Sequence, residues 1–154
     1  MGAWGTGIFE NDDALDWLLG WETADEGEGT ADDPGRIAFV IGAMAVAVDH
    51  KGYLEVDAGS VALAAAEVVA AASGKTGPAM KKGPDADGAL VELASWTRGP
   101  HAKLLNDPEV RTLARQAVDR AIGKDSEVAE LWDESEEGAQ WRAVAAELRN
   151  RLSN

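Results

Sequence analysis

The sequence contains no cysteine. Disulfide bonds, zinc–thiolate sites and cysteine nucleophiles are therefore excluded. Since the absence of cysteine is compatible with a reducing compartment, we expect a cytoplasmic protein.

The chain also lacks a long hydrophobic run. The longest apolar stretch covers residues 37–48, whereas a helix that spans a membrane needs roughly 18 to 20 such residues. We therefore expect no membrane-spanning segment.

Basic residues are scarce, with 14 lysines and arginines against 28 acidic residues and a net charge of −14. The phosphates of nucleic acids and of anionic lipids would be repelled by most of such a surface. We expect neither nucleic acid nor membrane as a partner. The charge suits a basic protein partner, a bound cation or high solubility.

Helical periodicity of apolar residues runs along most of the sequence. The chain has 154 residues, which is the usual length of about one domain. Caps and apolar spacing predict helices at about residues 11–21, 34–51, 57–73, 86–96, 101–105, 108–122, 126–132 and 141–152. The predicted fold class is therefore all-α: a single helical domain over residues 1–154 with about six to eight helices.

Two of these predicted helices, over residues 34–51 and 57–73, carry very few charges. A helix that is apolar on all sides belongs in the centre of a domain, so the pair should form a central antiparallel hairpin. Residues 74–88 are expected to form a long loop, which could be mobile or functional. The glycine-rich arm at residues 2–9 should pack on the domain, with Trp4 and Phe9 seated against the helices.

One candidate metal site lies at the start of the first predicted helix. Asp12, Asp13 and Asp16 form a DDxxD pattern, and carboxylates on one helical face are the ligands that hold Mg²⁺ beside a phosphate. No second acidic motif is found that would complete a prenyl-transferase type of site. Amphipathicity alone would place these three acids on the solvent side of the helix, which is the simpler interpretation.

One candidate partner-binding segment lies near the C-terminal part of the chain, where residues 125–137 contain no base. In this segment Glu130, Asp133 and Glu134 surround Trp132. Tryptophan is enriched at the energetic centres of protein interfaces, and the flanking acids would suit a basic partner.

The opening residues 1–17, MGAWGTGIFENDDALDW, and the later residues 126–132, SEVAELW, with Trp141 are together the basis of a family resemblance. The sequence resembles an uncharacterised bacterial family, domain of unknown function 4259. The resemblance implies a bacterial, cytoplasmic protein and brings no activity, substrate or cofactor with it.

These observations leave three hypotheses. The first is a non-enzymatic interaction protein, of the kind that immunity proteins exemplify, with a contiguous acidic face and an exposed aromatic residue. The alternative is a divalent-metal-dependent enzyme of phosphate chemistry that uses Asp12, Asp13 and Asp16. The third is a homo-oligomer in which the apolar hairpin completes a core between subunits.

Overall fold

The computed structural model describes residues 3–24, 34–81 and 88–153. Within these ranges the chain forms eight α-helices and one 3₁₀-helix. They are α1 (Asp12–Thr23), α2 (Pro34–Asp49), α3 (Val56–Ala72), α4 (Pro78–Lys81), α5 (Gly88–Arg98), η1 (Pro100–Leu105), α6 (Pro108–Ile122), α7 (Glu127–Asp133) and α8 (Gly138–Leu152). The all-α prediction is confirmed. Among the described helices, none is both long enough and apolar enough to cross a membrane.

One described helix was not predicted, because α4 lies inside the segment expected to be a loop. A helix of four residues is too short for apolar periodicity to reveal it. Residues 82–87 of the predicted loop lie outside the described part of the chain.

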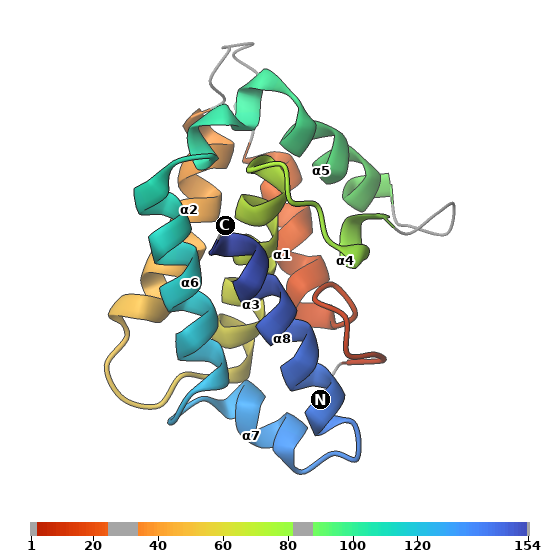
Figure 1. The fold of residues 1–154 in the computed structure, drawn as a ribbon, viewed down its shortest axis with the longest axis vertical. Coiled ribbons are helices and arrows are strands. Elements are labelled where there is room, and N and C mark those ends of the chain that lie inside the picture. The colour runs from red at the N-terminus through yellow and green to blue at the C-terminus, as the bar shows by residue number, and fades with distance from the viewer. Residues whose placement is uncertain (1–2, 25–33, 82–87, 154) are drawn as a thin grey trace.

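Helix α3 runs through the middle of the domain, with α2 and α6 on one side of it and α1 on the other (Figure 1). Every residue from 62 to 71 is buried, and most of them are alanine or valine. Small side chains let neighbouring helices approach closely from several directions, so an alanine-rich helix suits the centre of the domain.

Helix α2 packs against α3 as the predicted hairpin requires, but it is not buried on all sides. Val46 is 64% exposed, and Ala38 is exposed as well. The expectation of full burial is wrong for this outer face. Composition alone does not reveal how many neighbours a helix has, and α2 lies at the side of the domain against α3 and α6.

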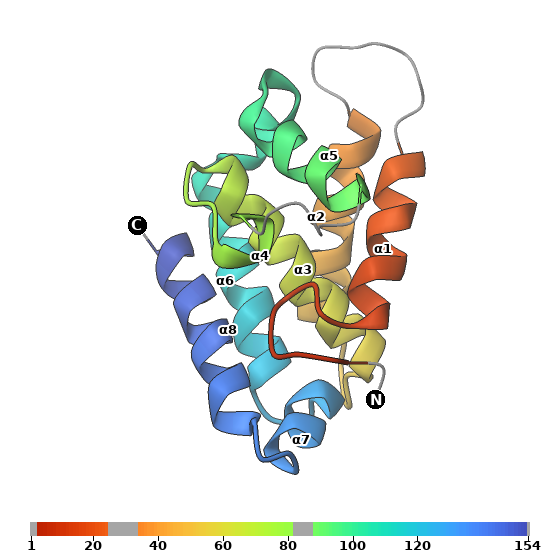
Figure 2. The same ribbon diagram turned by 90° about the vertical axis from the view of Figure 1, so that its right-hand side faces the viewer.

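The N-terminal arm crosses in front of α3, between α1 and α8 (Figure 2). An antiparallel bridge pairs Ala3 with Asn11, and the Trp4 amide donates to the Glu10 carbonyl at 3.1 Å. Phe9 is buried as predicted, but Trp4 is 59% exposed. Ala3 packs on the core, and successive residues of an extended strand point to opposite sides. Trp4 is therefore directed outward, which corrects the prediction that it fills the core.

Candidate functional site

The helices α3 and α7 begin at the lower end of the domain in Figures 1 and 2, and α1 begins above them beside α3. We call this region the acidic end. It comprises Asp12, Asp13 and Asp16 of α1, Glu55 and Asp57 at the start of α3, and Glu127, Glu130 and Glu134 in and next to α7. Carboxylates near a helix N-terminus are stabilised by the positive end of the helix dipole, so convergent N-termini concentrate negative charge.

Backbone hydrogen bonds hold the link between α2 and α3 against the start of α7. The Leu54 amide donates to the Asp125 carbonyl at 2.7 Å, and the Glu127 amide donates to the Leu54 carbonyl at 2.8 Å. The Glu127 carboxylate accepts from the Val56 amide at 2.8 Å, so a residue of α7 caps α3. This arrangement places the link residue Tyr53 beside the acids of α7.

Arg120 fastens the same junction from α6. Its guanidinium donates to the carbonyl oxygens of Gly52 at 2.5 Å and of Asp125 and Lys124 at 3.1 Å. These bonds hold the backbone of the two links together.

Tyr53 is the exposed aromatic residue of the acidic end, with 47% of its surface accessible. Desolvation raises the pKa of its hydroxyl, and a hydrogen bond and negative charge from Glu130 raise the pKa further, with Glu127 and Glu134 adding to the effect. The phenol therefore lies within reach of several carboxylates. No sequence pattern marks this residue, because it lies in a short link, although Glu55 and Asp57 follow within four residues.

Trp132, in contrast, is 7% exposed. Its indole stacks on Trp141 of α8 at a centroid distance of 6.1 Å, because positions 128 and 132 lie on the inner face of α7. The expectation that Trp132 is exposed between its acids is wrong. Glu130 and Glu134 are exposed as predicted.

Asp133 differs from the other two acids of the predicted partner-binding segment. Arg142 donates to both of its oxygens at 2.9 Å, and this hydrogen bonding lowers the pKa of the carboxyl. Arg142 also donates to the Ile122 carbonyl at 3.0 Å. Asp133 is therefore engaged within the fold, whereas Glu130 and Glu134 are exposed.

The three acids of the predicted metal site differ in burial. Asp12 and Asp16 are exposed, while Asp13 is partly buried and lines a cavity. Burial raises the pKa of the Asp13 carboxyl, and the charges of Asp57, Asp16 and Asp12 raise it further. In the part of the chain that the structure describes, no three histidine or acidic side chains come together as metal ligands would. The metal hypothesis therefore has no convergent ligand set.

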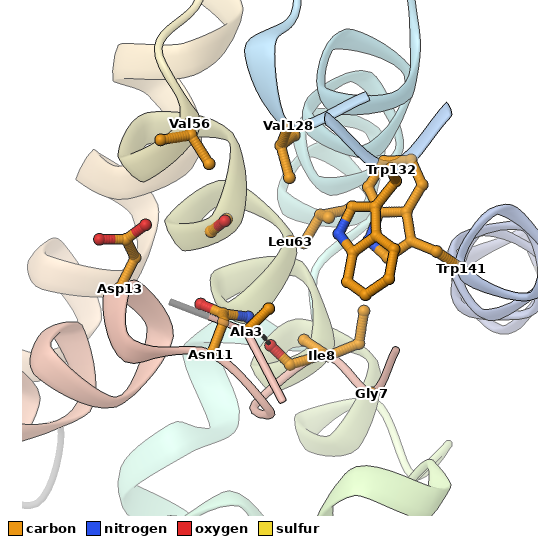
Figure 3. Close-up of a pocket in the computed structure, with 11 residues that line it drawn as sticks. Ala3, Gly7, Ile8, Asn11, Asp13, Val56, Leu63, Val128, Trp132 and Trp141 are labelled. Carbon is orange, nitrogen blue, oxygen red and sulfur yellow. Dashed lines mark hydrogen bonds between the residues drawn. The ribbon is translucent and has the colours of Figure 1, made fainter. Parts of the chain in front are cut away.

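The cavity beside Asp13 lies where the N-terminal arm meets α1, α3, α7 and α8 (Figure 3). Its volume is about 20 Å³, which is roughly the room of one water molecule. Its lining residues are Ala3, Gly7, Ile8, Asn11, Asp13, Val56, Ser60, Leu63, Val128, Trp132 and Trp141. No residue pattern in the sequence marks this cavity, because five separate segments form it.

Comparison with known proteins gives one result. The family described as "Domain of unknown function (DUF4259)" matches residues 2–144. No curated protein and no solved structure matches the chain.

Proposed function

The chain belongs to the family of domain of unknown function DUF4259, and from its geometry we propose that it is an interaction protein whose acidic end binds a basic protein. The observation that carries the proposal is the exposed Tyr53 surrounded by the carboxylates of Glu127, Glu130 and Glu134. In keeping with the family resemblance and the lack of cysteine, we propose that this binding takes place in the bacterial cytoplasm.

Two interactions link the helices that carry the acidic end. The charge of Asp57 acts on Asp13, which connects α3 with α1. The bond from Glu127 to Val56 connects α7 with α3. Negative charge collected on one surface raises the rate of encounter with a positively charged partner and favours the correct orientation.

Tyr53 adds an aromatic contact that can contribute more binding affinity than the exposed charges. Exposed acid–base pairs contribute little affinity because water and salt screen them. Tyrosine combines a large apolar ring with a polar hydroxyl, and it is enriched at the energetic centres of interfaces. An arginine or lysine of the partner could lie over the ring while its charge meets Glu130 or Glu134.

The test measures binding of a decalysine peptide to the full chain by calorimetry, at low and at physiological ionic strength. In the site variant, Glu130→Gln is combined with Glu134→Gln. The matched control combines Glu92→Gln with Glu109→Gln, which removes the same charge from exposed positions on α5 and α6.

We expect the site variant to bind about tenfold more weakly, equivalent to about 1.4 kcal/mol, and the control to change affinity by less than about twofold at physiological salt. Tyr53→Ala should weaken binding in the same direction as the site variant. Equal losses of decalysine affinity in the site variant and the control would contradict the proposal, since binding would then depend only on the net charge of the protein.

A further inference from the structure

The cavity beside Asp13 combines apolar walls with few polar groups. The indoles of Trp132 and Trp141 stand on one side and Asp13 on the opposite side (Figure 3). The polar lining side chains are those of Asn11, Asp13 and Ser60, and the two tryptophans add indole N–H donors. Asn11 is already engaged, because its oxygen accepts from the Ala14 amide at 2.8 Å and its amide nitrogen donates to the Ile8 carbonyl at 3.2 Å. Asp13 and Ser60 therefore define the chemistry of the cavity.

Ser60 is a buried residue, 4% exposed, whose side chain lines the cavity. Its hydroxyl makes no hydrogen bond to another residue in the ranges 3–24, 34–81 and 88–153. The polar groups of buried residues nearly always have a hydrogen-bond partner in the protein or in water. A hydroxyl of this kind at the wall of a cavity indicates that the cavity accepts a polar guest.

Asp13 is the only charged residue among those that line the cavity. Desolvation and the charges of Asp57, Asp16 and Asp12 raise its pKa, which means that the ionised form lacks compensation in the folded protein. A positive charge in the cavity would supply that compensation.

The size and donor set of the cavity restrict the cation. Mg²⁺ and Ca²⁺ take six or more oxygen ligands, whereas one carboxylate and one hydroxyl line this space. A guanidinium group exceeds a volume of about 20 Å³, while an ammonium group is about the size of a water molecule and carries three donors. We propose that the cavity receives the ammonium group of a lysine side chain from the basic partner. This inference rests on the proposed function, because the partner supplies the lysine.

The test uses n-butylammonium as a probe for the lysine side chain and follows the indole N–H signals of Trp132 and Trp141 by NMR in the full chain. We expect a saturable shift of both signals. Neutral n-butanol should give no such shift, because it lacks the charge, and n-butyltrimethylammonium should give none, because its head group exceeds the cavity. A shift by the trimethylated probe as strong as that by n-butylammonium would overturn the size argument.

Two variants with the same net charge distinguish binding in the cavity from general electrostatic attraction to the protein surface. Asp13→Asn should weaken n-butylammonium binding about tenfold, or about 1.4 kcal/mol, whereas Asp16→Asn, on an exposed position of the same helix, should change it less than about twofold. Ser60→Ala should weaken binding as well. Equal losses for Asp13→Asn and Asp16→Asn would overturn the inference.

The failure of this inference can be distinguished from the failure of the proposed function. If n-butylammonium leaves the indole signals unshifted while decalysine still binds through Glu130 and Glu134, the cavity holds water only and the acidic end remains the binding surface. If decalysine does not bind at all, the proposed function fails first.

Discussion

At the scale of single residues, Tyr53 offers a direct measure of the acidic end, because it is the only tyrosine in the chain. Replacing Glu130 by glutamine removes the negative charge that raises the tyrosine pKa and leaves only a neutral acceptor for the phenol hydrogen bond. We predict that the pKa of Tyr53 moves down toward its ordinary value of 10.0 in this variant. An absorbance titration of tyrosinate measures it, and an unchanged pKa would show that Glu130 does not face the phenol.

The same shift sets the sign of a pH effect on stability. The folded chain holds the phenol proton more tightly than the unfolded chain does, so the folded state binds more protons at alkaline pH. The free energy of unfolding should therefore be insensitive to Tyr53 below pH 10.0 and fall as the pH rises above that value through the pKa of the folded state.

A second residue-scale feature is the ion pair between Glu67 of α3 and Arg151 of α8. Glu67 is 1% exposed, and Arg151 donates to its two oxygens at 2.5 and 2.9 Å. Arg151→Met would leave the carboxylate buried without its partner. We predict a loss of about 3–5 kcal/mol in the free energy of unfolding, measured by denaturant titration.

Arg149→Met is the matched control for that variant. Arg149 pairs with Asp119 at 2.7 Å, but both side chains are largely exposed, so the expected loss is at most about 1 kcal/mol. Combining Glu67→Leu with Arg151→Met should restore most of the stability. Similar losses for the two single arginine variants would contradict the buried-charge explanation.

At the scale of elements, two glycines on helices have opposite requirements. A methyl group at Gly138 would overlap the backbone carbonyl of Trp132, so α8 begins in direct contact with the end of α7. At Gly42, in the middle of α2, a methyl group would meet no atom within 4 Å. Close packing therefore requires a glycine at position 138, whereas the glycine at position 42 only lowers the stability of its helix.

We therefore predict that Gly42→Ala raises the free energy of unfolding by about 0.5–1 kcal/mol, and that Gly138→Ala lowers it by about 1–3 kcal/mol because the backbone must shift. Thermal and denaturant unfolding of the two variants check this. A stabilised Gly138→Ala variant would show that the α7–α8 junction is looser than the structure indicates.

The elements also show how far the sequence determines this fold. The spacing of Trp17, Leu18 and Trp21 predicted α1, and the Asp107 cap before Pro108 predicted α6; these signals are local in the chain. Trp4 and Trp132 were assigned to the wrong environments, because local periodicity does not reveal which face another segment covers. Tyr53 and Ser60 became candidates only when distant segments had been placed side by side.

At the scale of the whole molecule, the net charge of −14 should oppose folding through self-repulsion. Bringing the N-termini of α1, α3 and α7 together concentrates this repulsion at the acidic end. We predict that added sodium chloride raises the melting temperature and that Asp13→Asn reduces the salt dependence. Scanning calorimetry over a salt series measures both effects, and a melting temperature that falls with salt would contradict the prediction.

The pair of Glu67 and Arg151 has a consequence for protein synthesis. Glu67 enters the centre of the domain, but its partner is made 84 residues later. During translation the central helix therefore cannot reach its final environment until α8 has left the ribosome. The family match ends at residue 144, so a chain cut at that boundary would lack Arg151. We expect such a fragment to be cleared by proteases rather than to accumulate as a smaller domain.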